Sequence, residues 1–213
     1  MFFYSGFTLK YNEQYEQAEW VAYLLADDEV RGTVERRDRF KADGNISTGS
    51  ASLADYRGLG YGRGHLAPAA DMKWSVQAMD ESFLMSNMSP QAPGFNRGIW
   101  KQLEEVVREW VIVNEEVCIV TGPLLADGPY EIIGENEVAI PKRFFKVILD
   151  CKEPDLKAIG FILPNEKCDK RLLAYIVSVD TVETETRIGF FYLLPDEHEE
   201  LLESSAIAEQ WQW

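Results

Sequence analysis

The chain contains only two histidines, and their surroundings differ. His65 ends a glycine-rich run and follows Arg63 by two residues, whereas His198 lies in an acidic stretch (196–200) that is typical of a solvated helix start. An imidazole with the ordinary pKa of about 6.5 accepts a proton close to neutral pH, so His65 is a candidate general base. A hydrogen-bonded histidine beside a tight turn is the competing interpretation, and periodicity alone slightly favours it.

Three polar residues downstream of His65 add further chemistry. Asn87 lies in a polar segment, and Asn96 and Glu104 lie on a predicted helix, about 80° apart around its axis and roughly 12 Å apart along it. Asn96 would also suit a helix cap, since asparagine is favoured there. Glu104 would also suit an ion pair with Arg108, four residues later on a solvated face.

Two helices are expected near these groups. Apolar side chains recur at helical spacing between Asn96 and Trp110, which predicts one amphipathic helix with the apolar residues Ile99, Trp100, Leu103, Val106, Val107 and Trp110. A shorter helix is expected after Asp71 and towards Met79. Asp71 is the best alternative carboxylate near the site, although a helix-cap role is favoured for it.

Short apolar runs predict the strands of a sheet, at residues 20–25, 117–121, 144–149, 158–163 and 172–179. Glycines occupy every second position from Gly58 to Gly64 within residues 55–68, which predicts a loop or distorted strand where backbone approaches something closely. The chain has no internal repeat, no low-complexity tract and no linker long enough to separate two domains. We therefore expect one domain, residues 1–213.

Composition narrows the function classes. The 213 residues carry 36 acidic and 21 basic side chains, a net charge of −15, in globular proportions that exclude disorder, collagen and coiled coil. No run approaches the roughly 20 apolar residues of a membrane helix, so no membrane partner is expected. A pI near 4.6 argues against non-specific nucleic-acid binding by the whole surface. However, residues 111–213 carry net −11 and residues 31–110 net +1, so a local positive patch is expected between Arg31 and Arg108.

The three cysteines are too few for a disulfide framework. A Cys151–Cys168 bridge with Cys118 as a buried thiol is arithmetically allowed, which leaves the redox compartment undecided. Neither the cysteines nor the histidines have the spacing of a structural zinc site. The N-terminal residues lack a basic region followed by a long apolar one, so the sequence shows no export signal.

Taken together, these segments resemble the DNA/RNA non-specific endonuclease family, which includes endonuclease G and the secreted bacterial sugar-non-specific nucleases. The resemblance rests on the order and spacing of residues 62–70 (Gly-Arg-Gly-His-Leu-Ala-Pro-Ala-Ala), 86–91 (Ser-Asn-Met-Ser-Pro-Gln) and 96–104, and extends to 120–124, 140–142 and 160–165. It implies a single α+β domain whose central, largely antiparallel sheet is flanked by helices and which contains a ββα-metal (His-Me finger) motif.

The resemblance also implies a role for each site residue. His65 would be the general base, and Asn96 would bind a divalent metal, Mg²⁺ with Mn²⁺ as a substitute. Glu104 would orient the water that the metal binds. Asn87 would help to position the histidine or the substrate, and Arg63 would lie near the scissile phosphate.

The chain departs from the family pattern at Gly62, where the family usually has aspartate, and this puts the local support of the loop in doubt. A second upstream arginine contributes in some relatives, and Arg36 and Arg37 are both candidates. Because many relatives are secreted, periplasmic or mitochondrial, an exported chain is the preferred expectation for location. A homodimer is also compatible with the resemblance.

The expected activity is metal-dependent hydrolysis of DNA and RNA with little sequence preference. A hard cation such as Mg²⁺ would polarise the phosphate, and it keeps several waters, so that one asparagine oxygen can suffice as a protein ligand. The main alternative is a catalytically weak relative that binds nucleic acid or a basic protein without cleaving. A third interpretation is an acidic interaction module that uses the C-terminal half of the chain.

Overall fold

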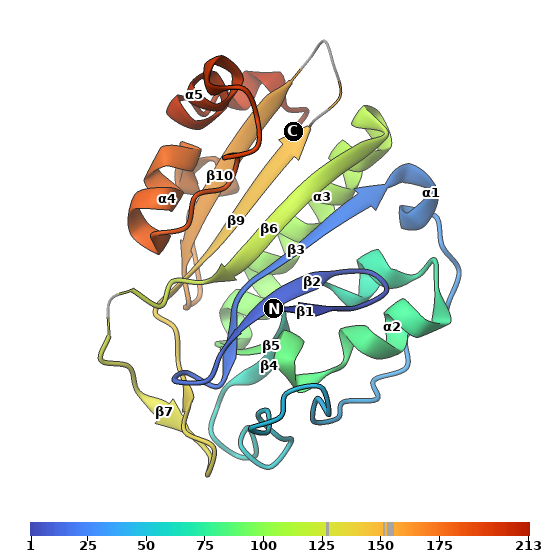
Figure 1. Cartoon of the computed structure of the whole chain (residues 1–213), viewed down its shortest axis with the longest axis vertical. Coiled ribbons are helices and arrows are strands. Elements are labelled where there is room, and N and C mark those ends of the chain that lie inside the picture. The colour runs from blue at the N-terminus through green and yellow to red at the C-terminus, as the bar shows by residue number, and fades with distance from the viewer. Residues whose placement is uncertain (127, 151, 153–155) are drawn as a thin grey trace.

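A seven-stranded sheet forms the centre of the computed structural model, which describes residues 1–126, 128–150, 152 and 156–213 (Figure 1). Every neighbouring pair of its strands is antiparallel. In spatial order the strands are β1 (Phe2–Phe3), β2 (Thr8–Asn12), β3 (Gln17–Ala26), β6 (Glu116–Pro123), β9 (Arg143–Asp150), β10 (Lys157–Pro164) and β11 (Ile176–Val177). Strands predicted at 20–25, 117–121, 144–149 and 158–163 are confirmed within β3, β6, β9 and β10.

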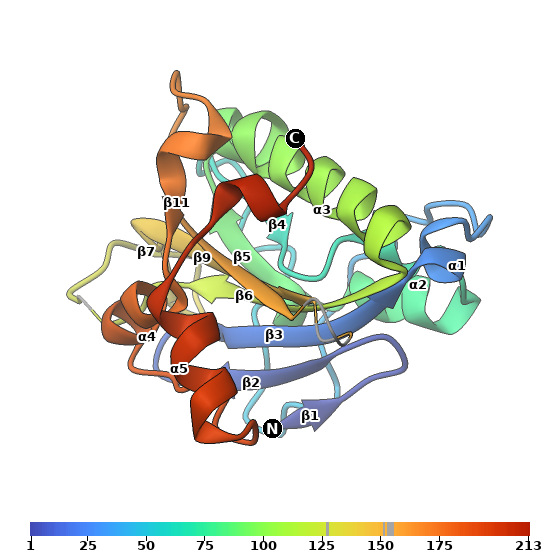
Figure 2. The same ribbon diagram turned by 90° about the horizontal axis from the view of Figure 1, so that it is seen from above.

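Both faces of the central strands are covered, as Figure 2 shows from above. Successive side chains on a strand point to opposite faces, so β9 contributes to two cores. Phe144 and Ile148 pack in the larger core with α3 (Lys101–Asn114), whereas Phe145 and Val147 pack in a second core with α4 (Val179–Thr186) and α5 (Asp196–Ser204). This burial on both faces explains why β9 is apolar at successive positions, with Lys146 as the exception between residues 144 and 149.

The amphipathic helix predicted from Asn96 to Trp110 is confirmed, and it continues to Asn114. Its first turn is π-helical, Phe95–Trp100, and contains the non-helical backbone of Gly98 (φ −102°, ψ −115°). The apolar stripe is buried against the sheet through Ile99, Trp100, Leu103, Val107, Trp110 and Val111. Its burial anchors the helix, so the polar side chains at its start are held in fixed positions.

Two predictions of secondary structure are wrong. Residues 172–179 do not form one strand: they form a 3₁₀ turn (Leu172–Tyr175), the two-residue β11 and the first residue of α4. The shorter helix, α2 (Val76–Ser82), starts later than predicted, because the Ser75 hydroxyl accepts a hydrogen bond from the Ala78 N–H and caps it. Asp71 lies instead in a 3₁₀ turn (Ala69–Met72) and caps no helix.

A separate hairpin carries the glycine-rich motif. Strand β4 (Gly62–His65) pairs antiparallel with β5 (Met88–Gln91), so that His65 lies opposite Met88. The preceding residues 55–61 form turns and bends, with positive φ at Gly58 and Gly60, which confirms the predicted loop. The remaining elements are α1 (Asp27–Val30), the strand pair β7 (Ile132–Ile133) and β8 (Val138–Ala139), and short 3₁₀ turns at Met85–Asn87 and Ala208–Gln210.

The architecture confirms the expected single α+β domain with a large antiparallel sheet flanked by helices (Figure 1). No helix in the described ranges is long and apolar enough to cross a membrane. The suggested Cys151–Cys168 bridge falls on Cys151, which lies outside the described residues.

Candidate active site

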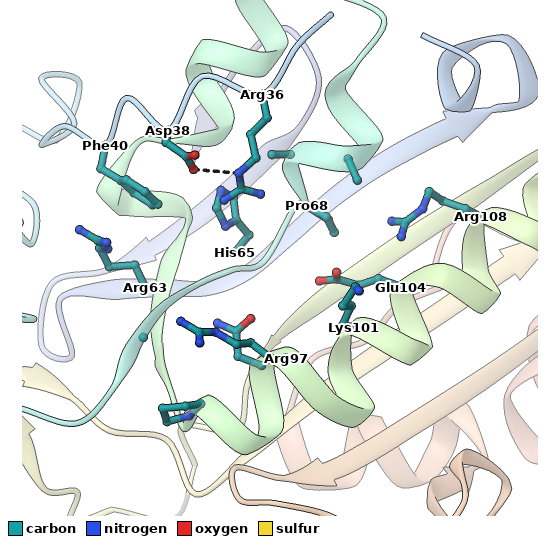
Figure 3. A pocket seen from close by; sticks show the side chains of 15 residues that line it. Arg36, Asp38, Phe40, Arg63, His65, Pro68, Arg97, Lys101, Glu104 and Arg108 are labelled. Carbon is teal, nitrogen blue, oxygen red and sulfur yellow. Dashed lines mark hydrogen bonds and ion pairs between the residues drawn. The ribbon is translucent and has the colours of Figure 1, made fainter. Parts of the chain in front are cut away.

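A cleft of about 450 Å³ opens between the β4–β5 hairpin and the start of α3 (Figure 3). His65 and Arg63 line it from β4, and Asn96 and Glu104 line it from the π-helical turn and α3. Four of the five predicted site residues therefore meet in one place. The cleft is also lined by residues from two further segments and the same helix, namely Arg36, Asp38, Phe40, Pro68, Ala69, Ala70, Pro93, Arg97, Lys101 and Arg108.

The His65 imidazole is packed between aromatic rings. Its ring lies 5.0 Å from the Phe83 ring, edge to face, and 5.8 Å from the Phe40 ring. Burial, together with the positive charge of Arg36 and Arg63, lowers the pKa of His65 to about 3, although Asp38 opposes this shift. The imidazole is therefore neutral at neutral pH.

One nitrogen of this imidazole lacks a partner. The His65 Nε2 is buried and has no hydrogen-bond partner among the described residues. The hydrogen-bonded histidine beside a turn, which periodicity alone favoured, does not describe this atom. This nitrogen is therefore free to form a hydrogen bond with a group outside the protein chain, water included.

Asn96 lies inside the π-helical turn and does not cap it, since the cap position is taken by Gly94. Its backbone N–H donates to the Ala92 carbonyl at 2.9 Å, which fixes the start of the turn. Its half-buried side chain lines the cleft and forms no hydrogen bond with any described residue. The amide oxygen is thus available to a ligand, and π-helical turns are frequent at functional sites.

Glu104 does not pair with Arg108 as the four-residue spacing suggested. The Arg108 guanidinium instead donates to Asp71 Oδ1 at 2.8 Å, and the Tyr23 hydroxyl donates to Asp71 Oδ2 at 2.8 Å. Asp71 is almost fully buried, so this pair lies in the wall of the cleft. Asp71, which the sequence suggested as an alternative carboxylate for the site, is therefore already ion-paired with Arg108.

Glu104 is influenced by a buried lysine that the sequence reading did not single out. Lys146, on the α3 side of β9, is 1% exposed, and its Nζ lies 4.7 Å from the centre of the Trp100 ring. Burial raises the pKa of Glu104, whereas the charges of Lys146 and Arg108 lower it. Burial lowers the pKa of Lys146 while Glu104 and Asp71 raise it. The only sequence signal was one charged residue within the apolar run 144–149.

Asn87 does not line the cleft and lies behind His65. Its Oδ1 accepts from the Ala67 N–H, and its Nδ2 donates to the carbonyls of Ala67 and Ser82, each at 2.9 Å. The Leu66 N–H also donates to the Asn87 carbonyl at 3.0 Å. These bonds fix the backbone immediately after His65. Of the two roles that the resemblance implied, this geometry favours positioning of the histidine over contact with substrate.

Comparisons with known proteins agree with this geometry. A model of the DNA/RNA non-specific endonuclease family matches residues 1–197. The chain belongs to this family. It is 35% identical to human mitochondrial endonuclease G over 87% of this chain and 67% of that protein, and 37% identical to nuclease C1 of Cunninghamella echinulata var. echinulata over 87% and 80%. A crystal structure of an EndoG/EndoGI complex, concerned with the mechanism of EndoG inhibition, superposes with a TM-score of 0.86 at 31% identity, covering 91% of this chain and 86% of that one.

Membership of the family and the names of these relatives identify the chain as a nuclease, so the acidic interaction module is excluded as its primary role. Coverage differs among the relatives, since the chain spans only 60% of the zebrafish mitochondrial nuclease EXOG, to which it is 37% identical.

The departure from the family pattern at Gly62 lies beside Asn96. A Cβ atom at Gly62 would lie 3.4 Å from Asn96 Nδ2 and 3.5 Å from the Gln91 carbonyl, and the backbone does not adopt a positive φ. Glycine is therefore not required there by sterics. Gly64 differs, because a Cβ would lie 2.0 Å from the Gln91 Cδ. An aspartate at position 62 would therefore lie next to Asn96, the predicted metal ligand. The loop that carries His65 is supported instead by the β4–β5 pairing and by Asn87.

The structure also separates the two upstream arginines. Arg36 lines the cleft and its guanidinium lies 5.1 Å from the Phe83 ring centre, whereas Arg37 pairs with Asp80 at 3.3 Å and is not a lining residue. Arg63 lies 4.2 Å over the Phe40 ring. The described lining includes five Arg or Lys side chains and two carboxylates, so the cleft is the positive patch that the charge distribution predicted: Arg36, Arg63, Arg97, Lys101 and Arg108 against Asp38 and Glu104. Arg97 and Lys101 carry no sequence signal beyond their place on the helix.

The donor set fits a hard divalent cation, as members of this metal-dependent family require. Asn96 and Glu104 offer oxygen atoms, which Mg²⁺ prefers, and no cysteine lines the cleft among the described residues. His65 lines the same cleft, and its buried Nε2 has no hydrogen-bond partner among the described residues.

Proposed function

We propose that this nuclease hydrolyses phosphodiester bonds of DNA and RNA with little sequence preference, using His65 as general base and Asn96 as the protein ligand of Mg²⁺. One observation carries the proposal: a neutral histidine with a buried, unpartnered nitrogen shares a basic cleft with Asn96 and Glu104. Neutral imidazole is the form that accepts a proton, and the surrounding cations favour a polyanionic ligand. The negative charge of that ligand would offset Arg36 and Arg63, which help to lower the pKa of His65, and so would make the imidazole a stronger base.

In this mechanism His65 Nε2 takes the proton from the attacking water. The aromatic walls formed by Phe40 and Phe83 limit ring rotation, and Asn87 holds the backbone that follows the histidine. Arg63 and Arg36 lie on the same side of the cleft and neutralise charge on the phosphate. Mg²⁺, when bound through Asn96, supplies polarisation of the phosphate and stabilisation of the departing oxygen.

Glu104 completes the site from α3. Burial raises the pKa of Glu104 to about 7, while Lys146 and Arg108 favour its ionised form. In that form the carboxylate accepts hydrogen bonds from water entering the cleft. Arg36, Arg63, Arg97 and Lys101 would contact phosphates, which position a nucleic acid without reading its sequence. This accounts for activity on both DNA and RNA. A homodimer and an exported location stay predictions.

Cleavage of supercoiled plasmid and of structured RNA, with Mg²⁺, with Mn²⁺ and after EDTA treatment, tests the proposal. We expect both substrates to be cut with either metal and neither after chelation. Full activity after exhaustive chelation would contradict it. Binding of both substrates without cleavage would favour the non-catalytic alternative.

A metal titration of two variants separates the roles. His65→Ala should lose on the order of 10²-fold or more at every Mg²⁺ concentration, because metal cannot replace a proton acceptor. Asn96→Ala should recover partly as Mg²⁺ is raised, because water and phosphate supply the remaining oxygens. His198→Ala, the other histidine, is the matched control and should keep wild-type activity. Metal rescue of His65→Ala but not of Asn96→Ala would reverse the assigned roles.

A further inference from the structure

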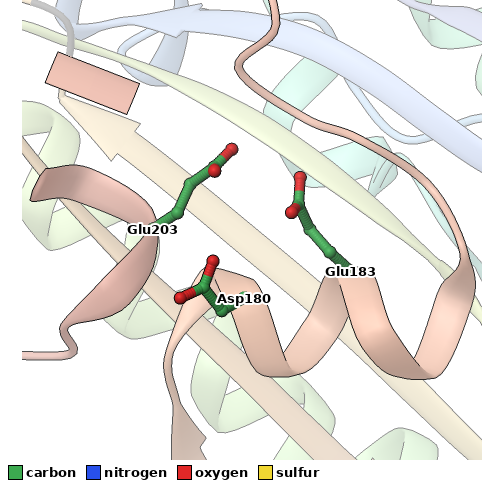
Figure 4. A group of neighbouring side chains, drawn as sticks. All are labelled: Asp180, Glu183 and Glu203. Carbon is green, nitrogen blue, oxygen red and sulfur yellow. The ribbon is translucent and has the colours of Figure 1, made fainter. Parts of the chain in front are cut away.

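Three carboxylates meet on the face of the sheet opposite to α3. Asp180 and Glu183 come from α4 and Glu203 comes from α5 (Figure 4). One oxygen from each lies within 4.8 Å of the others. The cluster lies on the two helices, α4 and α5, that contribute to the second core, and none of its members lines the nuclease cleft.

Glu203 is the unusual member of this cluster. It is 7% exposed, and its Oε1 is buried without a hydrogen-bond partner in the described part of the chain. In Figure 4 its carboxylate extends towards Glu183, and the Asp180 side chain lies beside it. Proteins rarely bury a carboxylate oxygen without a partner, because desolvation of the charge is costly.

The surroundings of the cluster supply no balancing cation. Among the described residues, Asp180, Glu183 and Glu203 form no ion pair. Two backbone N–H groups of the connecting loop reach it: the Phe190 N–H donates to Glu183 Oε1 at 2.7 Å, and the Phe191 N–H donates to the Glu203 carboxylate. Three acidic groups therefore face one another around a buried, unpartnered oxygen.

We propose that Asp180, Glu183 and Glu203 bind a divalent cation of the Ca²⁺ class, which holds α5 against α4. Ca²⁺ takes oxygen ligands at about 2.4 Å, so oxygens up to about 4.8 Å apart can share one ion. Asp180 is exposed, which leaves room for waters to complete the coordination. Mg²⁺ is less suited, because it demands near-ideal octahedral geometry. The proposal is independent of the nuclease mechanism.

A bound proton is the alternative way to relieve the repulsion among the three carboxylates. Burial and the charges of Glu183 and Glu199 raise the pKa of Glu203 to about 7, so a proton shared within the cluster would also relieve it. The two solutions differ in what Ca²⁺ does. A cation site gains Ca²⁺ binding and thermal stability, whereas a protonated cluster gains neither.

Calorimetric titration of the full chain with CaCl₂ tests the proposal. Glu203→Gln removes the buried charge with little change of shape, and Asp180→Asn removes an exposed ligand where folding is not at risk. Glu200→Gln is the matched control, because it removes one exposed charge from the same helix, outside the cluster. The nuclease cleft is unchanged in all four proteins, so its own metal binding cancels from the comparison.

We expect wild type and Glu200→Gln to bind one more Ca²⁺ than Glu203→Gln and Asp180→Asn, with a Kd on the order of 10⁻⁴ M. Saturating Ca²⁺ should raise the Tm of the first two proteins above that of the other two, while plasmid cleavage in Mg²⁺ stays unchanged in all. Equal Ca²⁺ stoichiometry in all four proteins would overturn the proposal. A Glu203→Gln protein that is more stable without Ca²⁺, beside a wild type that gains no additional ion, would establish the shared proton instead.

Discussion

Replacing His65 by glutamine should make the fold less sensitive to acid. The folded chain holds this imidazole neutral, since burial and the nearby Arg36 and Arg63 lower its pKa to about 3. The unfolded chain has an ordinary histidine with a pKa of about 6.5. Below pH 6.5 the unfolded state therefore binds a proton that the folded state does not, so acid favours unfolding until the pH falls to about 3.

The size of the effect follows from these two pKa values. At pH 5 the unfolded histidine is almost fully protonated, which lowers the free energy of unfolding by up to about 2 kcal/mol relative to pH 7. Other groups change their ionisation over the same interval. We therefore compare the change in the free energy of unfolding between pH 7 and pH 5 in wild type with the same change in the variant. A packing change at position 65 affects both pH values about equally and cancels from this comparison.

Urea unfolding at pH 7 and pH 5, followed by fluorescence of the six tryptophans and carried out in EDTA, measures this difference. Wild type should lose up to about 2 kcal/mol more than His65→Gln between the two pH values. His198→Gln keeps His65 and should keep the wild-type loss. An equal loss in wild type and His65→Gln would refute the reasoning, because it would mean that His65 takes up a proton equally in the folded and unfolded states.

Two further predictions concern the neighbours of Asn96 and Glu104. Gly62→Asp should lower the Mg²⁺ concentration needed for half-maximal cleavage, because a Cβ at this position would lie 3.4 Å from Asn96 Nδ2 and a carboxylate there can orient the Asn96 amide. Gly62→Asn is the control for side-chain size. An unchanged Mg²⁺ dependence in folded Gly62→Asp would contradict the prediction. Lys146→Met should move the acidic limb of the pH–activity profile up by about one unit, since a buried cation that favours ionised Glu104 is lost, with a roughly tenfold loss below that limb. Lys157→Met is the control, because it also removes a lysine next to a tryptophan ring but lies outside the cleft, and it should leave the pH–activity profile unchanged. If the acidic limb does not move in Lys146→Met, Lys146 has no electrostatic effect on Glu104.

The sequence predicts the fold and the site best where a local pattern of residues is compatible with only one kind of structure. The apolar runs within β3, β6, β9 and β10 are confirmed because each is bounded by turn signals and buried in a sheet. The run 172–179 is not, because a short apolar run is compatible with a strand or with a helix start. Ser178 decides between them, since its hydroxyl accepts from the Thr181 N–H and begins α4.

Contacts between distant segments are what local patterns miss. The spacing of Glu104 and Arg108 suggests an ion pair, but Arg108 finds Asp71, 37 residues away, once the 3₁₀ turn has packed beside α3. Lys146 is visible in the sequence only as a charge in an apolar run. Its proximity to Glu104 requires the register of β9 within the sheet and the packing of Trp100 on it.

The basic and acidic side chains lie on different parts of the molecule, which explains how a chain with a net charge of −15 can bind a polyanionic substrate. The basic side chains of the cleft come from residues 36–108, whereas the acidic excess lies in residues 111–213 and includes the cluster on α4 and α5. Salt screens exposed charges over about 10 Å at 0.1 M, so a phosphate in the cleft interacts mainly with the arginines around it and only weakly with the far face. At low ionic strength that screening weakens and the whole-molecule charge opposes approach. Substrate capture by this chain therefore depends on short-range contacts within the cleft rather than on long-range attraction.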